Sequence, residues 1–275
     1  MPVQDTFAVS EFTESRTETD VQAEEIRVIG YTLLPDVLDA DELQAAREKL
    51  DALYRIQLDE IGGEAQLRRI NDEHVVRAPF AYDEFFLGLA TKPAVLALAR
   101  QLLGGAYFQL MTQNGVINVP ATGQQHAAGA WHRDLNYQHF VSSRPLSVSA
   151  LLCIDDFSSA TGGTFMLPGS HRIEAFPSDP FVGRQQMQMV APAGSAIVFD
   201  SMLYHRTGLN VSQGSRRAIN HRYTVPFVKQ QLDFPALLGG KYEDDPELRR
   251  LLGYESRPDR SVKEFRLRRL ARAGQ

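Results

Sequence analysis

The residues best suited to chemistry are His132 and Asp134, which stand two positions apart in the run WHRDLNY at residues 131–137. Side chains two apart in a strand point to the same side, so this imidazole and this carboxylate could hold one ion. A His-x-Asp pair also arises often by chance at an exposed strand end. His205 offers a third donor, because it ends an apolar strand candidate that a jelly-roll topology would bring back beside the early strands.

Two histidines and one carboxylate on one face of an octahedral ion leave three positions open, as in the non-haem Fe(II) oxygenases. A zinc site more often uses a closed tetrahedral set of ligands. The chain has one cysteine and no His-Glu-x-x-His helix, so it lacks the common zinc signatures. The sequence therefore favours iron over zinc.

Arg216 offers a second binding function. It follows His205 by 11 positions (216 − 205), at the start of a strand candidate that could lie antiparallel to the one before it. A fixed guanidinium fork at this place could bind a dicarboxylic cosubstrate through two parallel charge-assisted hydrogen bonds. Lysine would do this poorly.

The composition is that of an ordinary globular protein, with 275 residues, 43% of them hydrophobic, and a net charge of −5. This acidic balance argues against a nucleic-acid partner, because phosphate binding needs clustered Lys and Arg. The basic cluster at 260–275 is better explained as a solvated or subunit-contacting helix. The single cysteine, Cys153, and the lack of a long apolar run predict a soluble, cytoplasmic protein without a membrane partner.

A single domain at 23–275 is expected, after an arm at 1–22 that is rich in Ser, Thr and acidic residues and is predicted to be mobile. A helical preamble at 36–105 contains two helices, at 39–61 and 91–105, which apolar spacing and end signals indicate. The aperiodic segment between them could form a loop over a cleft.

Residues 106–230 predict a mainly β core, a double-stranded β-helix or jelly roll, with flanking helices. Residues 231–275 return to a helical tail. The strand candidates lie at 107–119, 131–137, 146–157, 162–171, 186–192, 194–200, 204–209 and 216–228.

Several of these motifs, in this order, resemble the phytanoyl-CoA dioxygenase family of Fe(II)- and 2-oxoglutarate-dependent oxygenases. WHRDLNY is similar to the family's His-x-Asp strand, GGTFMLPGSHR to its Gly-x-x-x-x-Pro-Gly-Ser/Thr-His turn, and HRTGLNVSQGSRRAI to its segment with the distal histidine and arginine. The resemblance runs from the segment GYTLLPDVL to the strand RRAINHRYTVPF.

The resemblance implies that His132, Asp134 and His205 bind iron and that Arg216 binds the distal carboxylate of 2-oxoglutarate. Arg217 competes for that last role, but the family's spacing favours Arg216, and strand neighbours point to opposite faces. Further contacts to 2-oxoglutarate are expected from Thr207, Thr164 and Asn118.

The implied reaction uses O2 and 2-oxoglutarate, releases succinate and CO2, and by default hydroxylates an unactivated carbon of a small molecule. Asp134 argues against halogenation, because halogenating relatives have a small residue in its place. Two alternatives remain: a jelly-roll metalloenzyme that does not use 2-oxoglutarate, and a retired relative that only binds a ligand.

The substrate pocket is expected from the irregular segment around 61–86, the strand near Gln113 and the loop after Asp134. The candidate contacts are Gln113, Tyr137, His139 and Arg77. Two other histidines have structural explanations. His171 belongs to the Pro-Gly-Ser-His turn and is predicted to form hydrogen bonds within the protein. His221 alternates with Ile219 and Tyr223 and is predicted to be packed in the core.

Overall fold

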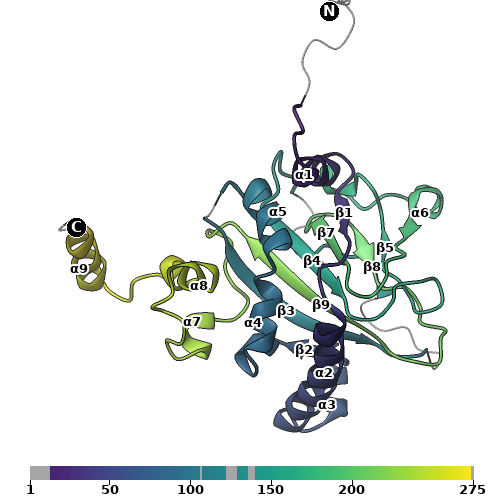
Figure 1. Cartoon of the computed structure of the whole chain (residues 1–275), viewed down its shortest axis with the longest axis horizontal. Coiled ribbons are helices and arrows are strands. Elements are labelled where there is room, and N and C mark those ends of the chain that lie inside the picture. Colours follow the sequence, from purple (N-terminus) through teal and green to yellow (C-terminus); the bar gives the residue numbers. More distant parts are fainter. Residues whose placement is uncertain (1–12, 106, 122–128, 136–139, 274–275) are drawn as a thin grey trace, which may run out of the picture.

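The computed structural model describes residues 13–105, 107–121, 129–135 and 140–273. Within them, two antiparallel sheets form a jelly-roll core with flanking helices, as the strand pattern predicts (Figure 1). The larger sheet has the strand order β1-β7-β4-β9-β3-β2, and the smaller sheet has the order β6-β5-β8. The strands are β1 (Tyr31–Leu34), β2 (Val75–Arg77), β3 (Gln109–Asn118), β4 (Ser147–Cys153), β5 (Phe165–Met166), β6 (Met187–Gln188), β7 (Ala196–Asp200), β8 (His205–Arg206) and β9 (Arg216–Thr224).

Strand β4 is buried along its whole length and separates two parts of the hydrophobic core. Val148, Ala150 and Leu152 pack against helices on one side, while Leu151 and Cys153 pack on the other side with residues of the smaller sheet. Because successive side chains of a strand point to opposite faces, both faces of β4 are covered. This explains why the whole strand, SVSALLC, is buried, and Cys153 is a buried thiol.

Helices cover the face of the larger sheet that lies away from the smaller sheet. The two helices expected from the sequence are present: Asp39 caps the first through a capping box, and Gly104, in a left-handed conformation, ends the second. The helices are α1 (Glu18–Val28), α2 (Ala40–Glu60), α3 (Glu64–Arg69), α4 (Phe85–Ala90), α5 (Pro93–Leu103), α6 (Asp179–Gln185), α7 (Phe234–Leu237), α8 (Pro246–Leu251) and α9 (Val262–Ala273).

Three segments differ from expectation. Helix α1 begins at Glu18 behind a Thr17 capping box, so regular structure starts inside the segment 1–22, whose residues 1–12 lie outside the described ranges. The aperiodic segment after α2 holds α3 and the three-residue strand β2, which pairs with β3. Residues 131–135 form no strand, since His132 makes only an isolated bridge with His205. Such short elements depend on distant partners and leave no periodic signal.

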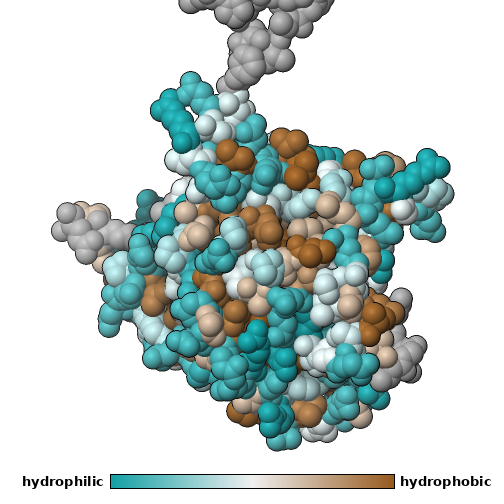
Figure 2. Space-filling model, turned by 45° about the vertical axis from the view of Figure 1, so that its right-hand side comes forward, coloured by the Kyte–Doolittle hydropathy of each residue, from teal (hydrophilic) through white to brown (hydrophobic). Residues whose placement is uncertain are grey.

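The face of the molecule in Figure 2 is mainly hydrophilic, with hydrophobic residues in separate small groups. Such groups are usual on a folded surface. Among the described helices, none is both long and apolar enough to cross a membrane.

His221 is packed in the core, as its alternation predicted. It is fully buried on β9, and Gln113 Nε2 donates a 2.8 Å hydrogen bond to its Nε2, which must therefore be unprotonated. Burial lowers the pKa of His221 to about 3. In the unfolded chain this histidine has its ordinary pKa of about 6.5. Between about pH 6.5 and 3 it therefore binds a proton in the unfolded chain but not in the folded protein.

This difference predicts an acid sensitivity. As the pH falls from about 6.5 toward 3, His221 should lower the free energy of unfolding by about 1.4 kcal/mol per pH unit. The variant His221→Gln removes the proton site, so its unfolding free energy should fall less steeply. Urea unfolding of both proteins at pH 6.5 and 5.0 measures the slopes, and equal slopes would contradict the assignment.

Candidate active site

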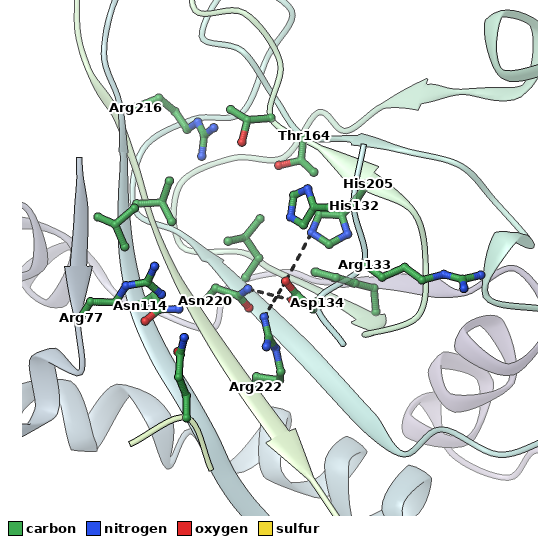
Figure 3. A pocket seen from close by; sticks show the side chains of 16 residues that line it. Arg77, Asn114, His132, Arg133, Asp134, Thr164, His205, Arg216, Asn220 and Arg222 are labelled. Atoms are coloured by element: carbon green, nitrogen blue, oxygen red, sulfur yellow. Dashed lines mark hydrogen bonds and ion pairs between the residues drawn. The ribbon is translucent and has the colours of Figure 1, made fainter. Parts of the chain in front are cut away.

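A pocket of about 310 Å3 lies between the two sheets and gathers the candidate residues (Figure 3). His132, Asp134, His205 and Arg216 all line it. The other lining residues are Val75, Arg77, Asn114, Val116, Arg133, Leu151, Thr164, Phe199, Thr207, Asn220, Arg222 and Gln231.

The three predicted metal ligands meet through a backbone bridge. The N–H of His132 donates to the carbonyl of His205, and the N–H of His205 donates to the carbonyl of His132, each at 3.0 Å. One donor atom from each of His132, Asp134 and His205 lies within 4.8 Å of the others. Asp134 Oδ1 is 3.8 Å from His205 Nε2. This spacing and donor set suit the shell of one divalent ion.

Both histidines are held in the form that a metal needs. Nδ1 of His132 lies 2.9 Å from the Ala130 carbonyl, and Nδ1 of His205 lies 3.0 Å from the Leu203 carbonyl. A carbonyl can only accept, so each Nδ1 carries the proton and each Nε2 is left as the ligand atom. Burial, followed by the charge of His132, lowers the pKa of His205 to about 4. His205 is therefore a neutral imidazole at physiological pH.

Asp134 is held as a charged carboxylate by three side chains. Its Oδ2 accepts hydrogen bonds from the Ser149 hydroxyl and from Asn220 Nδ2, the latter at 3.1 Å, while its Oδ1 pairs with Arg222 Nη2 at 2.7 Å. Burial alone would raise the pKa of Asp134, but the Arg222 guanidinium and the two histidines outweigh it and hold the pKa well below its usual range.

Arg216 is a buried cation without an ion pair among the described residues. Its Nη2 donates to the Gly162 carbonyl at 3.2 Å, its guanidinium carbon lies 4.2 Å from the centre of the Phe157 ring, and its buried Nε has no partner there. Burial lowers its pKa to about 10, so the side chain still carries its charge at neutral pH. A buried charge is normally paired, so this arrangement suits an anionic ligand.

Arg217, the competitor for this role, points to the opposite face of β9. It forms ion pairs with Asp51 of α2 at 2.7 Å and with Asp155 at 3.1 Å. Its position on the far side of the strand follows from the alternation of side chains. Arg217 therefore ties helix α2 to the sheet, while Arg216 faces the pocket.

Thr207 and Thr164 line the same pocket, but Asn118 does not. Asn118 Nδ2 donates to the Gly208 carbonyl at 3.1 Å and lies 3.4 Å from the Gly162 carbonyl. A Cβ at Gly162, whose φ is +73°, would lie 2.6 Å from the Asn118 amide nitrogen. Asn118 thus holds two loops beside Arg216.

The four expected substrate residues have different positions. Arg77 lines the pocket and pairs with Asp72. Gln113 lines a neighbouring cavity instead, and its side chain is bonded to the Phe80 amide, the Phe86 carbonyl and His221. Tyr137 and His139 lie outside the described residues. His171 is buried and lies 3.3 Å from the Arg27 carbonyl, which confirms its structural role.

Sequence reasoning missed Asn220 and Arg222, which contact Asp134. The signal was available, because both lie an even number of positions after Arg216 on β9 and so share its face. Ser149 was also missed. It sits opposite Arg222 on the paired strand β4, a relation that no local pattern reveals.

A jelly roll that gathers two imidazoles, one carboxylate and a buried arginine in one pocket defines the class of non-haem iron oxygenases that use 2-oxoglutarate. The family model for phytanoyl-CoA dioxygenase matches residues 26–218, and the chain belongs to this family. The matched residues include the motifs that carry the resemblance seen in the sequence.

Two kinds of similarity accompany the family match. The uncharacterized protein Rv1501 of Mycobacterium tuberculosis is 34% identical over 273 residues, which cover 95% of this chain and 97% of that protein. Among solved structures, EctD from S. alaskensis with 2-oxoglutarate and 5-hydroxyectoine has a TM-score of 0.63 at 21% identity, covering 79% of this chain and 80% of that one. HygX from Streptomyces hygroscopicus with nickel and 2-oxoglutarate has a TM-score of 0.59 at 17% identity, covering 80% and 91%. These structures share the jelly-roll fold.

Proposed function

We propose that this protein is an Fe(II)- and 2-oxoglutarate-dependent dioxygenase that hydroxylates an unactivated carbon of a small molecule and releases succinate and CO2. The observation that carries the proposal is the pairing, in one pocket, of a three-ligand metal site with the uncompensated buried Arg216. Hydroxylation is the default outcome of this class, and the solved relatives with 2-oxoglutarate support the choice of cosubstrate.

In this proposal, Nε2 of His132, Nε2 of His205 and Oδ1 of Asp134 would hold the iron, and the iron would supply the activation of O2. The protein's contribution is to fix these atoms. Ser149 and Asn220 bind the other carboxylate oxygen of Asp134 and so decide which oxygen faces the metal.

Arg216 binds the distal carboxylate of 2-oxoglutarate, with the hydroxyl groups of Thr207 and Thr164 beside it. Apolar side chains of Val116, Leu151 and Phe199 also line the pocket. Arg216 itself is buried, and burial strengthens the charge pairing of a carboxylate with it.

Two alternatives are less well supported. A metalloenzyme that does not use 2-oxoglutarate would need Arg216 as a structural ion-pair residue, and no such pair exists in the described residues. A retired ligand-binding relative has no need of three positioned metal ligands. A small-molecule partner and a cytoplasmic location remain part of the proposal, and the buried thiol of Cys153 suits a reducing compartment.

The first experiment is anaerobic titration of the metal-free protein with Fe(II) and 2-oxoglutarate. We expect the weak visible charge-transfer band of a chelated 2-oxoglutarate complex. We also expect quenching of Trp131, the only tryptophan, because it directly precedes His132. Quenching without a band would favour the metalloenzyme alternative, and neither signal would favour the retired relative.

A further inference from the structure

The pocket has a second polar end, away from Arg216. Figure 3 shows Arg222, Asn220, Asn114 and Arg77 gathered there, while Arg216 lies at the other end. Asn220 and Arg222 come from β9, Asn114 comes from the neighbouring β3, and Arg77 ends β2. Because the proposed function gives the Arg216 end to 2-oxoglutarate, this end remains for the organic substrate.

The cations that line the pocket differ in what they already bind. Arg77 is paired with Asp72. The Arg133 side chain points away from the metal ligands (Figure 3), donates to the Ser170 carbonyl at 3.0 Å and stacks on Tyr204 at 4.1 Å. Arg222 pairs with the metal ligand Asp134. Its side chain is 13% exposed, and its buried Nε has no partner among the described residues.

The Asp134 oxygen that Arg222 contacts is the one assigned to iron. Oδ1 is 2.7 Å from Arg222 Nη2 and 3.8 Å from His205 Nε2. A metal ion on Oδ1 would compete with Arg222 for the same oxygen and weaken this ion pair. The guanidinium would then have hydrogen-bond donors free for a ligand in the pocket.

The charges of the assembled site lead to the same expectation. A divalent iron balances a dianionic 2-oxoglutarate, and the single charges of Asp134 and Arg216 balance each other. Arg222 then remains as a largely buried cation without a counter-ion, a costly arrangement unless a ligand supplies the negative charge.

We propose that Arg222 binds an anionic group of the organic substrate, a carboxylate or a phosphate, through charge-assisted hydrogen bonds. The inference rests on the proposed function and adds a substrate class to it. Arginine suits this role, because its planar fork matches both kinds of anion.

The uncharged remainder of such a substrate has room next to Arg222. A cavity of about 300 Å3 shares Arg77, Asn114 and Gln231 with the pocket. Four of its seven other lining residues are apolar: Ile70, Ala78, Leu232 and Phe234. An anionic molecule with an apolar body therefore fits the two cavities better than a small, fully polar one.

The test uses matched probes on the anaerobic complex with iron and saturating 2-oxoglutarate, so that Arg216 is occupied. Benzoate and phenyl phosphate are compared with the neutral benzamide, by calorimetry and by the change in the visible band. We expect at least one anion to bind more tightly than benzamide. The stronger of the two anions identifies the group.

The Arg222→Gln variant should bind the preferred anion about 10- to 100-fold more weakly, with benzamide little changed. Arg222→Lys keeps the charge and should lose less, which guards against a variant that fails to fold. Arg217→Gln, on the opposite face of β9, is the matched control and should keep the preference.

Two outcomes would overturn the inference. The first is that the wild-type protein binds benzoate, phenyl phosphate and benzamide with equal affinity. The other is an Arg222→Gln protein that loses iron affinity yet keeps the anion preference, which would make Arg222 a positioning residue for Asp134 alone. In both cases the wild-type band still forms and the proposed function stands. Absence of that band would instead overturn the proposed function, and this inference with it.

Discussion

Replacing Asp134 by asparagine should lower turnover by more than about 100-fold, the upper loss seen when only a supporting residue of a metal site is removed. The substitution keeps the shape of the side chain but removes the charge that iron needs. The same change leaves Arg222 without its counter-ion in the metal-free protein. Breaking a largely buried ion pair from one side destabilises a protein by about 3 kcal/mol or more.

A second variant separates these two effects. The double variant Asp134→Asn, Arg222→Gln removes the cation that the single variant leaves unpaired, so its free energy of unfolding should return toward the wild-type value. Its iron affinity, followed by quenching of Trp131, should stay low. If Asp134→Asn binds iron as tightly as wild type, Asp134 is not a ligand, and the three-residue site must be abandoned.

Replacing Arg216 by methionine should weaken 2-oxoglutarate binding by about 100-fold, because two charge-assisted hydrogen bonds to a carboxylate are lost. Quenching of Trp131 by iron should be unchanged, since Arg216 is not a metal ligand. The stability of the metal-free protein should rise or stay constant. Arg216 is 2% exposed and lacks an ion pair in the described residues, so methionine removes an unfavourable buried charge.

Arg217 provides a control, because its replacement should lower stability and leave 2-oxoglutarate affinity unchanged. Arg217→Met breaks the ion pairs with Asp51 and Asp155 and should destabilise the protein, while 2-oxoglutarate affinity stays at the wild-type level. Calorimetric titration with 2-oxoglutarate and urea unfolding give both quantities for both variants. A loss of 2-oxoglutarate affinity in Arg217→Met alone would reverse the assignment of the two residues.

The parts of the fold that could be predicted from sequence carry their own local signals. The helix after Asp39 and the helix ending at Gly104 were found because capping residues and apolar spacing act within one element. Strands β4, β7 and β9 were found because each is a bounded run of strand-forming residues. The candidate metal ligands could be predicted because each lies within a short sequence motif of the family.

The missed features depend on contacts between distant segments. The prediction that His132 and Asp134 lie close together is confirmed. The strand that was expected to place them on one side is absent, because His132 makes only one backbone bridge, to His205. Asn118 was expected at 2-oxoglutarate, but its amide is occupied by loop carbonyls. The face of β9 on which Arg222 lies could be predicted from its spacing after Arg216, but its ion pair with Asp134, 88 positions earlier (222 − 134), could not.

Strand β9 lies in the middle of the larger sheet, paired with β3 on one edge and β4 on the other. A strand held on both edges hardly stretches, so Arg216 and Arg222 stay about 20 Å apart along it, at roughly 3.3 Å per residue. If one end of β9 binds 2-oxoglutarate and the other end binds the substrate's anionic group, β9 fixes the distance between the two. The position of the oxidised carbon would then be counted from the anionic group, and molecules of different shape could react at the same distance from their charge.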